Sequence, residues 1–266
     1  TKDILDRCKQ IFFCGSYGDP SVHPKFIEIL EWFRSQRHDL WLYIHTNGAK
    51  RKEGFWQQIA KIMNGYGQID FGIDGLEDTN HLYRVGVKYE HAIQNARDFI
   101  MAGGKAKWNF IVFKHNEHQI DRVKALAKEY GFTECLVRKT GRFFDQKKLE
   151  PMEKWPVKNS MGHTIRHLEM PNDPQYRNDS VSRVQEIKNK YGSLIDYFKQ
   201  TEITCDALLG NKVVITAEGI VMPCNFFEHN LYDARFHEDT HPGSFDPLGK
   251  NLYNNQIIKM YDKYGK

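Results

Sequence analysis

Residues 11–24 read Ile-Phe-Phe-Cys-Gly-Ser-Tyr-Gly-Asp-Pro-Ser-Val-His-Pro. The apolar residues that open this stretch predict a short buried strand, and a loop with Gly15, Gly18 and Pro20 follows it. An amphipathic helix is predicted to begin at Pro24, because apolar side chains then recur on one helical face. Such a loop can present backbone amides to a small ligand, but an ordinary turn between a strand and a helix has the same pattern.

The same alternation of strand and helix continues along the chain. Strand-like runs begin near Ile11, Leu40, Ile69, Trp108 and Cys135, and an amphipathic helical pattern separates each from the next. This regular alternation predicts parallel strands joined by crossover helices, and therefore an α/β fold. The runs are short and continuously apolar, which favours strands that are covered on both faces.

The alternation stops after Arg138. We interpret residues 139–180 as a long polar connection with one short helix near 160–168, and residues 181–199 as helical again. The pattern predicts a β-hairpin over 213–222. The predicted organisation has three parts, namely an α/β core (1–138), a linker with a helix (139–200) and a C-terminal extension (201–266).

Composition is that of an ordinary globular protein, with 266 residues, 40% hydrophobic and 27% charged, and a net charge of +4. No basic stripe with interleaved aromatic residues indicates nucleic acid, and no run is apolar and long enough to predict a membrane span. No signal-peptide pattern opens the chain, and the five cysteines are too scattered for a disulfide framework. We therefore expect a reducing, cytoplasmic setting, with Cys14 and Cys135 as buried thiols inside strands.

Polar residues or glycine follow every predicted strand of the core. In a parallel βα barrel, ligand-binding groups collect at these carboxyl ends of the strands. The strand ends are 15–20, 45–48, 74–75 with 83–84, 114–117, and 138–139. Their common position predicts one shared site.

The residue types at these ends suit a zwitterionic ligand that carries a nucleoside. Carbonyl groups of the glycine loop can accept hydrogen bonds from an ammonium group, and Arg84 can pair with a carboxylate through two hydrogen bonds. Asp74 can accept hydrogen bonds from ribose hydroxyls. The alternatives are that the Asn47-Gly48 and Asp74-Gly75 pairs are simple turns, and that Arg84 is a solvated surface charge.

Segments 13–23, 46–48, 73–75 and 83–84, in this order and spacing, resemble the radical S-adenosylmethionine (SAM) enzymes. The resemblance is closest to the branch with a SPASM or twitch C-terminal extension, which includes peptide-modifying enzymes. It covers roughly residues 9–138 and 201–227. It implies a partial (β/α)6 barrel, here lacking its first strand, followed by a small C-terminal extension with a β-hairpin and cysteines.

The resemblance also implies roles for individual residues at the strand ends. The family has a serine where this chain has Gly72, so one contact to the SAM carboxylate is expected to be lost. The implied SAM-binding positions are Gly18, Asp19 and Pro20 at the amino group, Arg84 at the carboxylate, Thr46, Asn47 and Asp74 near the sugar or methionine part, and Asn116 at the border of the adenine.

Cys205 and Cys224, with a glycine between them, match the opening of the SPASM cysteine pattern. The resemblance implies that these thiolates bind an auxiliary iron–sulfur cluster. The residues by themselves also allow two cysteines that merely flank a hairpin, or a zinc site completed by His229, His237 or His241.

The family's defining loop, Cys-x-x-x-Cys-x-x-Cys, is absent from this sequence. Cys8 and Cys14 do not have its spacing, and they lie after the place where it belongs. We expect that this loop, which binds the [4Fe-4S] cluster that cleaves SAM, precedes Thr1 in a longer natural protein. The later cysteines of a full SPASM domain are also absent after Cys224.

The implied function is that of a radical SAM enzyme whose intact form generates a 5′-deoxyadenosyl radical and modifies a substrate, with a peptide as the leading candidate. An electron donor such as a flavodoxin or ferredoxin is implied, and the fragment alone is expected to be inactive. The alternatives are a non-catalytic barrel that binds a nucleoside or peptide, and a zinc-dependent hydrolase that uses His45 and His115. No catalytic acid or base is assigned, although Tyr17, His115 and Glu117 lie at strand ends.

Overall fold

The computed structural model describes residues 2–15, 18–49, 53–145, 150–159, 161–202, 204, 206–216 and 221–222. The chain divides into one compact unit of residues 1–181 and another of residues 182–266. The three predicted parts, with boundaries at 138 and 200, stay a prediction. No helix in the described part of the chain is both long and apolar enough to cross a membrane.

Parallel strands form the centre of the first unit. Within the described residues, the sheet has the order β1-β2-β3-β4-β5, and each neighbouring pair is parallel. The bounds are β1 (Gln10–Phe13), β2 (Trp41–Thr46), β3 (Gly67–Gly72), β4 (Ala106–Ile111) and β5 (Glu134–Arg138). Each strand begins within two residues of its predicted start, so the predicted α/β alternation is confirmed.

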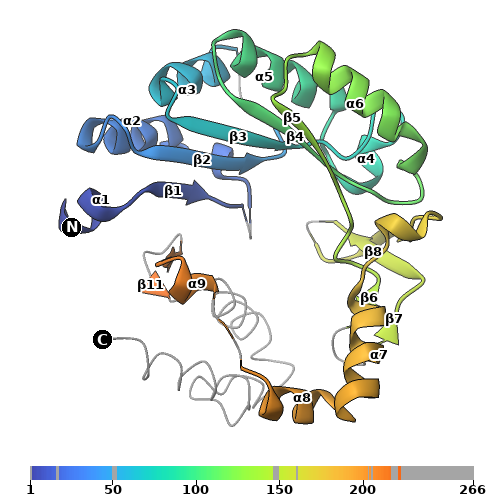
Figure 1. The fold of residues 1–266 in the computed structure, drawn as a ribbon. Helices are drawn as coiled ribbons and strands as arrows, with labels where there is room; N and C mark the ends of the chain where they lie inside the picture. Colours follow the sequence, from blue (N-terminus) through green and yellow to red (C-terminus); the bar gives the residue numbers. More distant parts are fainter. Residues whose placement is uncertain are drawn as a thin grey trace. The chain divides into compact units, whose positions relative to one another are not determined.

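The crossover helices lie together on one face of this sheet (Figure 1). They do so because successive strands are neighbours and each strand–helix–strand connection turns with the same hand. The crossovers are α2 (Phe26–Gln36), α3 (Phe55–Met63), α5 (Tyr89–Met101) and α6 (Ile120–Glu129), and α1 (Lys2–Arg7) precedes β1. With β1 and β5 as its edges in the described residues, the sheet is an open, partial barrel, as predicted.

The core lies between the sheet and these helices. Leu42 and Ile44 of β2 are fully buried there, and Leu30, Ile59 and Phe99 from the helices belong to the same cluster. Successive side chains of a strand point to opposite faces, so alternate residues reach the second face of the sheet.

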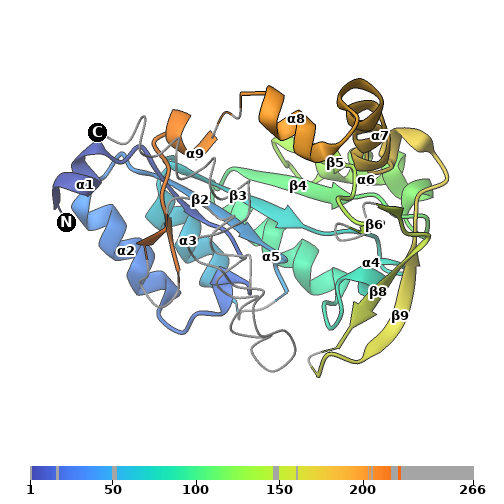
Figure 2. The same cartoon turned by 90° about the horizontal axis from the view of Figure 1, so that it is seen from below.

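The expectation that the strands are covered on both faces is wrong for β2. Its residues alternate between buried and half-buried, and Tyr43 and His45 lie on the face opposite the helices, which Figure 2 views. Tyrosine combines an apolar ring with a polar end, so the aromatic residues of this strand concealed the alternation in the sequence.

The cysteines of the sheet differ in their surroundings. Cys14 was expected inside a strand, but β1 ends at Phe13 and Cys14 is exposed in the loop that follows. Cys135 in β5 is half-buried, and burial raises the pKa of its thiol to about 11. That thiol is therefore protonated at neutral pH.

The predicted helix near 160–168 is wrong, because this segment is half of a β-hairpin. Asn159 accepts hydrogen bonds from the backbone N–H groups of Met161 and His163, and Gly162 has a φ of +80°. Such a tight turn joins antiparallel strands and is incompatible with a continuous helix. The added strands are β6 (Phe144–Asp145), β7 (Glu150–Pro151), β8 (Lys154–Lys158) and β9 (Thr164–Glu169), of which β6 pairs with β7 and β8 with β9.

Helices and a short hairpin make up the described part of the second unit. The predicted helix over 181–199 is confirmed, but it is interrupted where Gly192 has a φ of +81° and Ser193 caps the next helix through Asp196 N–H. The predicted hairpin is also confirmed, since β10 and β11 pair antiparallel. The bounds are α7 (Ser180–Tyr191), α8 (Leu194–Gln200), α9 (Asp206–Leu209), β10 (Val214–Ile215) and β11 (Val221–Met222).

Candidate functional site

Asp19 joins the end of β1 to the end of β2. It is the N-cap of a short 3-10 helix, η1 (Pro20–Val22), and its carboxylate accepts hydrogen bonds from Ser21 N at 2.9 Å and Ser21 Oγ at 2.6 Å. The same carboxylate accepts from Thr46 Oγ1 at 2.8 Å and from Asn47 N at 2.7 Å. The predicted residues Asp19, Thr46 and Asn47 are therefore in contact, and Asp19 acts here as a support for both loops.

The glycine loop before Asp19 is compact. A Cβ atom on Gly15 would lie 1.9 Å from the carbonyl oxygen of Gly18, so only glycine fits that position. Gly18 itself is exposed, and Pro20 occupies the first position of η1, where its missing N–H costs nothing. The predicted residues Gly18 and Pro20 thus lie on either side of a carboxylate that fixes the loop.

Asp74 joins the end of β3 to the end of β4. Its side chain is 0% exposed, and the carboxylate accepts hydrogen bonds from Arg84 Nε and from Ile111 N, both at 2.6 Å. The backbone is held as well, since Asp74 N donates to Asn80 Oδ1 and Asp74 O accepts from Asn116 Nδ2. Asp74 therefore positions Arg84 and the β4 end.

Asn116 also has a supporting position. It is fully buried, and its amide group donates to Asp74 O at 2.8 Å and to Ile111 O at 2.9 Å while accepting from Phe113 N at 2.7 Å. These contacts use both amide protons and the carbonyl of the side chain. The loop that Asn116 holds can border a ligand through its backbone and neighbouring residues.

Arg84 keeps part of its guanidinium group available. Its Nε binds Asp74, while Nη1 and Nη2 have no partner among the described residues, and the side chain is 25% exposed. Burial opposes the charge and the Asp74 carboxylate favours it, with the net result that the pKa of Arg84 is raised. A fixed, charged guanidinium with two unpaired nitrogens is suited to bind a carboxylate.

Gly72 provides the room for this guanidinium. A Cβ atom at residue 72 would lie 2.5 Å from Arg84 Nη2 and 3.6 Å from the carbonyl oxygen of Thr46. The Asp19 cluster and the Asp74 cluster therefore meet around Gly72. Arg84 Nη2 occupies the space that a larger side chain at residue 72 would need.

Two buried side-chain nitrogens in segments that follow β3 and β4 lack hydrogen-bond partners within the described part of the chain. Asn80 Nδ2 and His115 Nε2 are buried and have no hydrogen-bond partner among the described residues. The His115 ring stacks on Phe113, with centroids 5.4 Å apart, and burial followed by the nearby His118 charge lowers the pKa of His115 to about 4. Buried polar atoms normally have partners, and Trp56 Nε1 and Gln57 Oε1 in α3 lack them as well among the residues that the structure describes, so these atoms do not by themselves mark a ligand site.

Sequence reasoning missed the supporting residues Ser21, Asn80 and Ile111. The Asp19-Pro20 pair is a typical start of a helical turn, and this pattern could have indicated that Asp19 caps its own loop. No local pattern indicates that Asn80 or the Ile111 amide would bind Asp74, because both contacts depend on the packed strands.

The predicted metal ligands Cys205 and Cys224 lie outside the described residues, as does Tyr17. Among the described residues, no group of three or more His, Cys, Asp or Glu side chains could hold a metal ion. The zinc-hydrolase alternative is not favoured, because His45 contacts Tyr43 and Asp70 instead of a ligand cluster.

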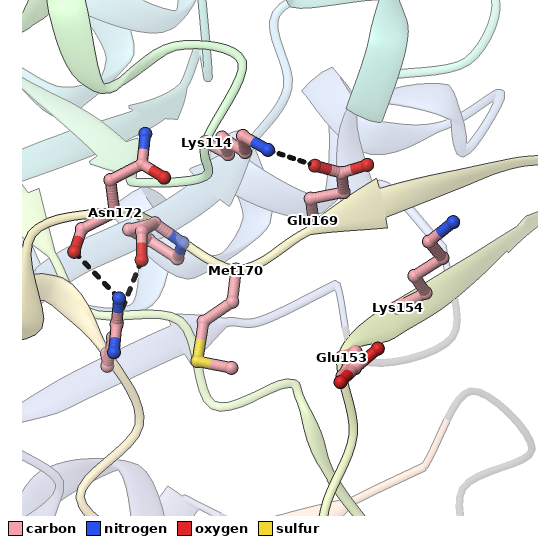
Figure 3. Close-up of a pocket in the computed structure, with 8 residues that line it drawn as sticks. Lys114, Glu153, Lys154, Glu169, Met170 and Asn172 are labelled. Carbon is pink, nitrogen blue, oxygen red and sulfur yellow. Dashed lines mark hydrogen bonds and ion pairs between the residues drawn. The ribbon is translucent and has the colours of Figure 1, made fainter.

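A separate pocket of about 280 Å³ lies beside the β8–β9 hairpin (Figure 3). Lys114 points toward Glu169 and forms an ion pair with it, and Arg177 donates hydrogen bonds to the carbonyl oxygens of Pro171 and Asn172. Its lining residues are Lys114, Glu153, Lys154, Glu169, Met170, Pro171, Asn172 and Arg177. The mixed charges and internal pairing give this pocket no clear ligand class.

Comparison with known proteins gives relatives for about half of the chain. Mycofactocin maturase MftC of Mycobacterium ulcerans (strain Agy99) is 26% identical over 142 residues, which are 52% of this chain and 37% of that protein. The MftC of Mycolicibacterium smegmatis is also 26% identical over 142 residues, with 35% of its length covered. The match thus spans little more than a third of these relatives, and no family model matches the chain.

The comparison with solved structures found Streptococcus suis SuiB bound to S-adenosylmethionine, with a TM-score of 0.47 and 15% identity over 82% of this chain and 48% of that chain. Another is anSMEcpe with bound AdoMet and a peptide, with a TM-score of 0.44 and 16% identity over 59% and 45% of the respective chains. The chain is therefore similar, over about half of its length, to curated mycofactocin maturases.

Proposed function

We propose that the intact protein is a radical SAM enzyme that modifies a peptide. The observation that carries this proposal is Arg84, whose charged guanidinium is fixed by Asp74 at the strand ends with Nη1 and Nη2 unpaired among the described residues. Arg84 would bind the carboxylate of SAM, and Gly72 leaves the space that this arrangement needs.

The surrounding residues fit the remainder of the ligand. We assign the loop of Gly18 and Pro20, which Asp19 holds, to the amino group of SAM, and the contacts of Asp19 with Thr46 and Asn47 support this assignment. Asn80 Nδ2 and His115 Nε2 are buried atoms that a polar ligand could satisfy.

Asp74 and Asn116 contribute by support, since their polar groups are used within the chain. Bound SAM and a reduced [4Fe-4S] cluster supply the radical chemistry, while the protein supplies orientation.

The peptide substrate and the partners rest on the family branch. The curated relatives are named maturases, SuiB has been solved with the precursor peptide SuiA, and anSMEcpe has been solved with a peptide. We propose that this protein also acts on a peptide and receives electrons from a donor such as a flavodoxin or ferredoxin. We further propose that Cys205 and Cys224 bind an auxiliary cluster.

Isothermal titration of anaerobic, cluster-loaded complete protein with SAM tests the role of Arg84. Arg84→Gln removes a charge-assisted contact, so the dissociation constant should rise about 10- to 100-fold. Arg84→Lys keeps the charge but loses the paired geometry, and an intermediate value is expected. Lys128→Gln is the control, because Lys128 is exposed in the last turn of α6, the end of the helix that leads into β5 and away from the carboxyl ends of the strands. Equal SAM affinity in wild type and Arg84→Gln would contradict the proposal, as would an intact wild-type enzyme that forms no 5′-deoxyadenosine.

A further inference from the structure

A hydrogen-bonded cluster of Tyr43, His45 and Asp70 lies on the second face of the sheet, opposite the crossover helices. His45 of β2 is directly across from Asp70 of β3 in the parallel register. The Asp70 side chain is 1% exposed, whereas that of His45 is 38% exposed. A buried carboxylate thus stands behind an accessible imidazole.

The Asp70 carboxylate is well supplied with donors. Its Oδ2 accepts from Tyr43 Oη at 2.6 Å, and its Oδ1 accepts from Gln68 Nε2 at 3.0 Å. Burial raises the pKa of Asp70, but the hydrogen bonds from His45 and Tyr43 outweigh it, and the pKa is lower than usual. Burial and the Asp70 hydrogen bond both raise the pKa of Tyr43, so its hydroxyl keeps its proton.

These contacts determine which nitrogen of His45 carries the proton. His45 Nε2 lies 3.0 Å from Tyr43 Oη and 3.3 Å from Asp70 Oδ2. Tyr43 gives its only proton to Asp70, so both oxygens facing Nε2 are acceptors, and Nε2 must be the donor. The neutral ring therefore has its lone pair on Nδ1, which has no partner among the described residues.

Packing fixes the orientation of the ring. Phe12 stacks on Tyr43 with ring centroids 4.8 Å apart and meets His45 edge to face at 4.7 Å. Rotation of the imidazole would break both the hydrogen bonds and this aromatic contact. The fold therefore fixes the orientation of the imidazole and of its unprotonated Nδ1. An acid–base histidine requires such a fixed ring.

We propose that His45 is the proton-accepting group on this face of the barrel, with Asp70 and Tyr43 as its positioning residues. The inference rests on the proposed function, because the proton that His45 accepts comes from the substrate that this function modifies. A substrate N–H or O–H bond breaks, its electron pair stays on the substrate atom, and the proton forms a bond to His45 Nδ1. The resulting imidazolium is balanced by the Asp70 carboxylate, and no oxidant or reductant takes part in this step.

The tautomer of His45 can be measured in the complete protein without a substrate. In protein labelled with ¹⁵N-histidine, the ring nitrogen signals of His45 should show the proton on Nε2. In Asp70→Asn, the new amide can donate to Nε2, so the proton should move to Nδ1. Asp39→Asn is the matched control, since Asp39 is an exposed carboxylate just before the same strand, and it should leave the His45 signals unchanged.

Diethyl pyrocarbonate, which reacts with an unprotonated imidazole nitrogen, probes the accessibility of Nδ1. Peptide mapping should show His45 modified in wild type and at least about 10-fold more slowly in Asp70→Asn, where the lone pair lies on the enclosed Nε2. Exposed His38 should react equally in both proteins and is the reagent control, whereas unchanged fluorescence of the buried Trp56 and Trp108 shows that Asp70→Asn remains folded.

A wild-type proton on Nδ1, or equal reactivity of His45 in both proteins, would overturn the inference about His45. Failure of the intact wild type to form 5′-deoxyadenosine would instead overturn the proposed function, so the two failures are distinguishable.

Discussion

Replacing Asp74 with Asn removes a buried negative charge while keeping the shape of the side chain. The wild-type carboxylate holds Arg84 Nε and Ile111 N at 2.6 Å, so it joins the end of β3 to a charged residue and to β4. In the variant, the amide oxygen can serve one of these donors, and the amide N–H₂ must then face the other.

The expected loss in the free energy of unfolding depends on how deeply Asp74 and Arg84 are buried. Removing one partner of a buried ion pair costs about 3–5 kcal/mol, because the other charge is left without compensation. Arg84 is 25% exposed and Asp74 is 0% exposed, so water can solvate part of the remaining charge. We therefore expect Asp74→Asn to lower the free energy of unfolding by about 2–3 kcal/mol.

Urea unfolding followed by tryptophan fluorescence measures this loss. All tryptophans of the sequence lie in residues 1–181, so the emission reports on the unit that contains Asp74. With a slope near 2–3 kcal/mol per molar urea, the midpoint should fall by about 1 M. Asp39→Asn, at an exposed pair with Arg37, should change the free energy of unfolding by less than about 0.5 kcal/mol. A loss of under about 1 kcal/mol in Asp74→Asn would refute the argument that removal of this carboxylate leaves the charge of Arg84 without compensation.

Other predictions concern the ligand, the pH and the cluster. Gly72→Ala should force Arg84 Nη2 to move and weaken SAM binding about 5- to 10-fold by isothermal titration, and unchanged affinity would contradict the steric argument. His115 has a pKa of about 4 when folded against an ordinary 6.5, so the unfolded chain takes up its proton first and stability should fall as pH decreases from 6.5 to 4. Because His115 is partly solvated, the free energy of unfolding measured in urea should fall by about 1 kcal/mol over this pH range. This decrease should be absent in His115→Gln. Alanine at Cys205 and Cys224 should remove the iron of one cluster per chain in elemental analysis, whereas unchanged iron would show that these thiols are not ligands.

Local patterns predicted the core of this fold well. The strand starts near Leu40 and Trp108, for example, were found within two residues of their predicted positions. Apolar runs and glycine stops act over a few neighbouring residues, so they can be seen without the rest of the molecule. The same patterns wrongly predicted a helix at 160–168. In the structure, Leu168 of β9 pairs with Trp155 of β8 and is not part of a helical face.

The site shows the same division at the level of single residues. The family resemblance implied that Asp19 lies in the loop at the SAM amino group, and the strand-end position of Asp74 predicted that its carboxylate accepts hydrogen bonds from ribose hydroxyls. The structure places both in contact with chain atoms, namely Thr46 and Asn47 for Asp19, and Arg84 and Ile111 for Asp74. A carboxylate can accept hydrogen bonds from protein or ligand alike, so its residue type alone does not decide its role.

The sequence by itself determined the alternation of strands and helices, the polar strand ends and the family resemblance carried by their motifs. Only the tertiary structure decided that Arg84 keeps unpaired nitrogens beside Gly72, and that His45 stands in front of buried Asp70. The physical reason is that hydrophobic period and turn chemistry are local, whereas hydrogen-bond partners and burial are set by strands brought together from distant parts of the chain.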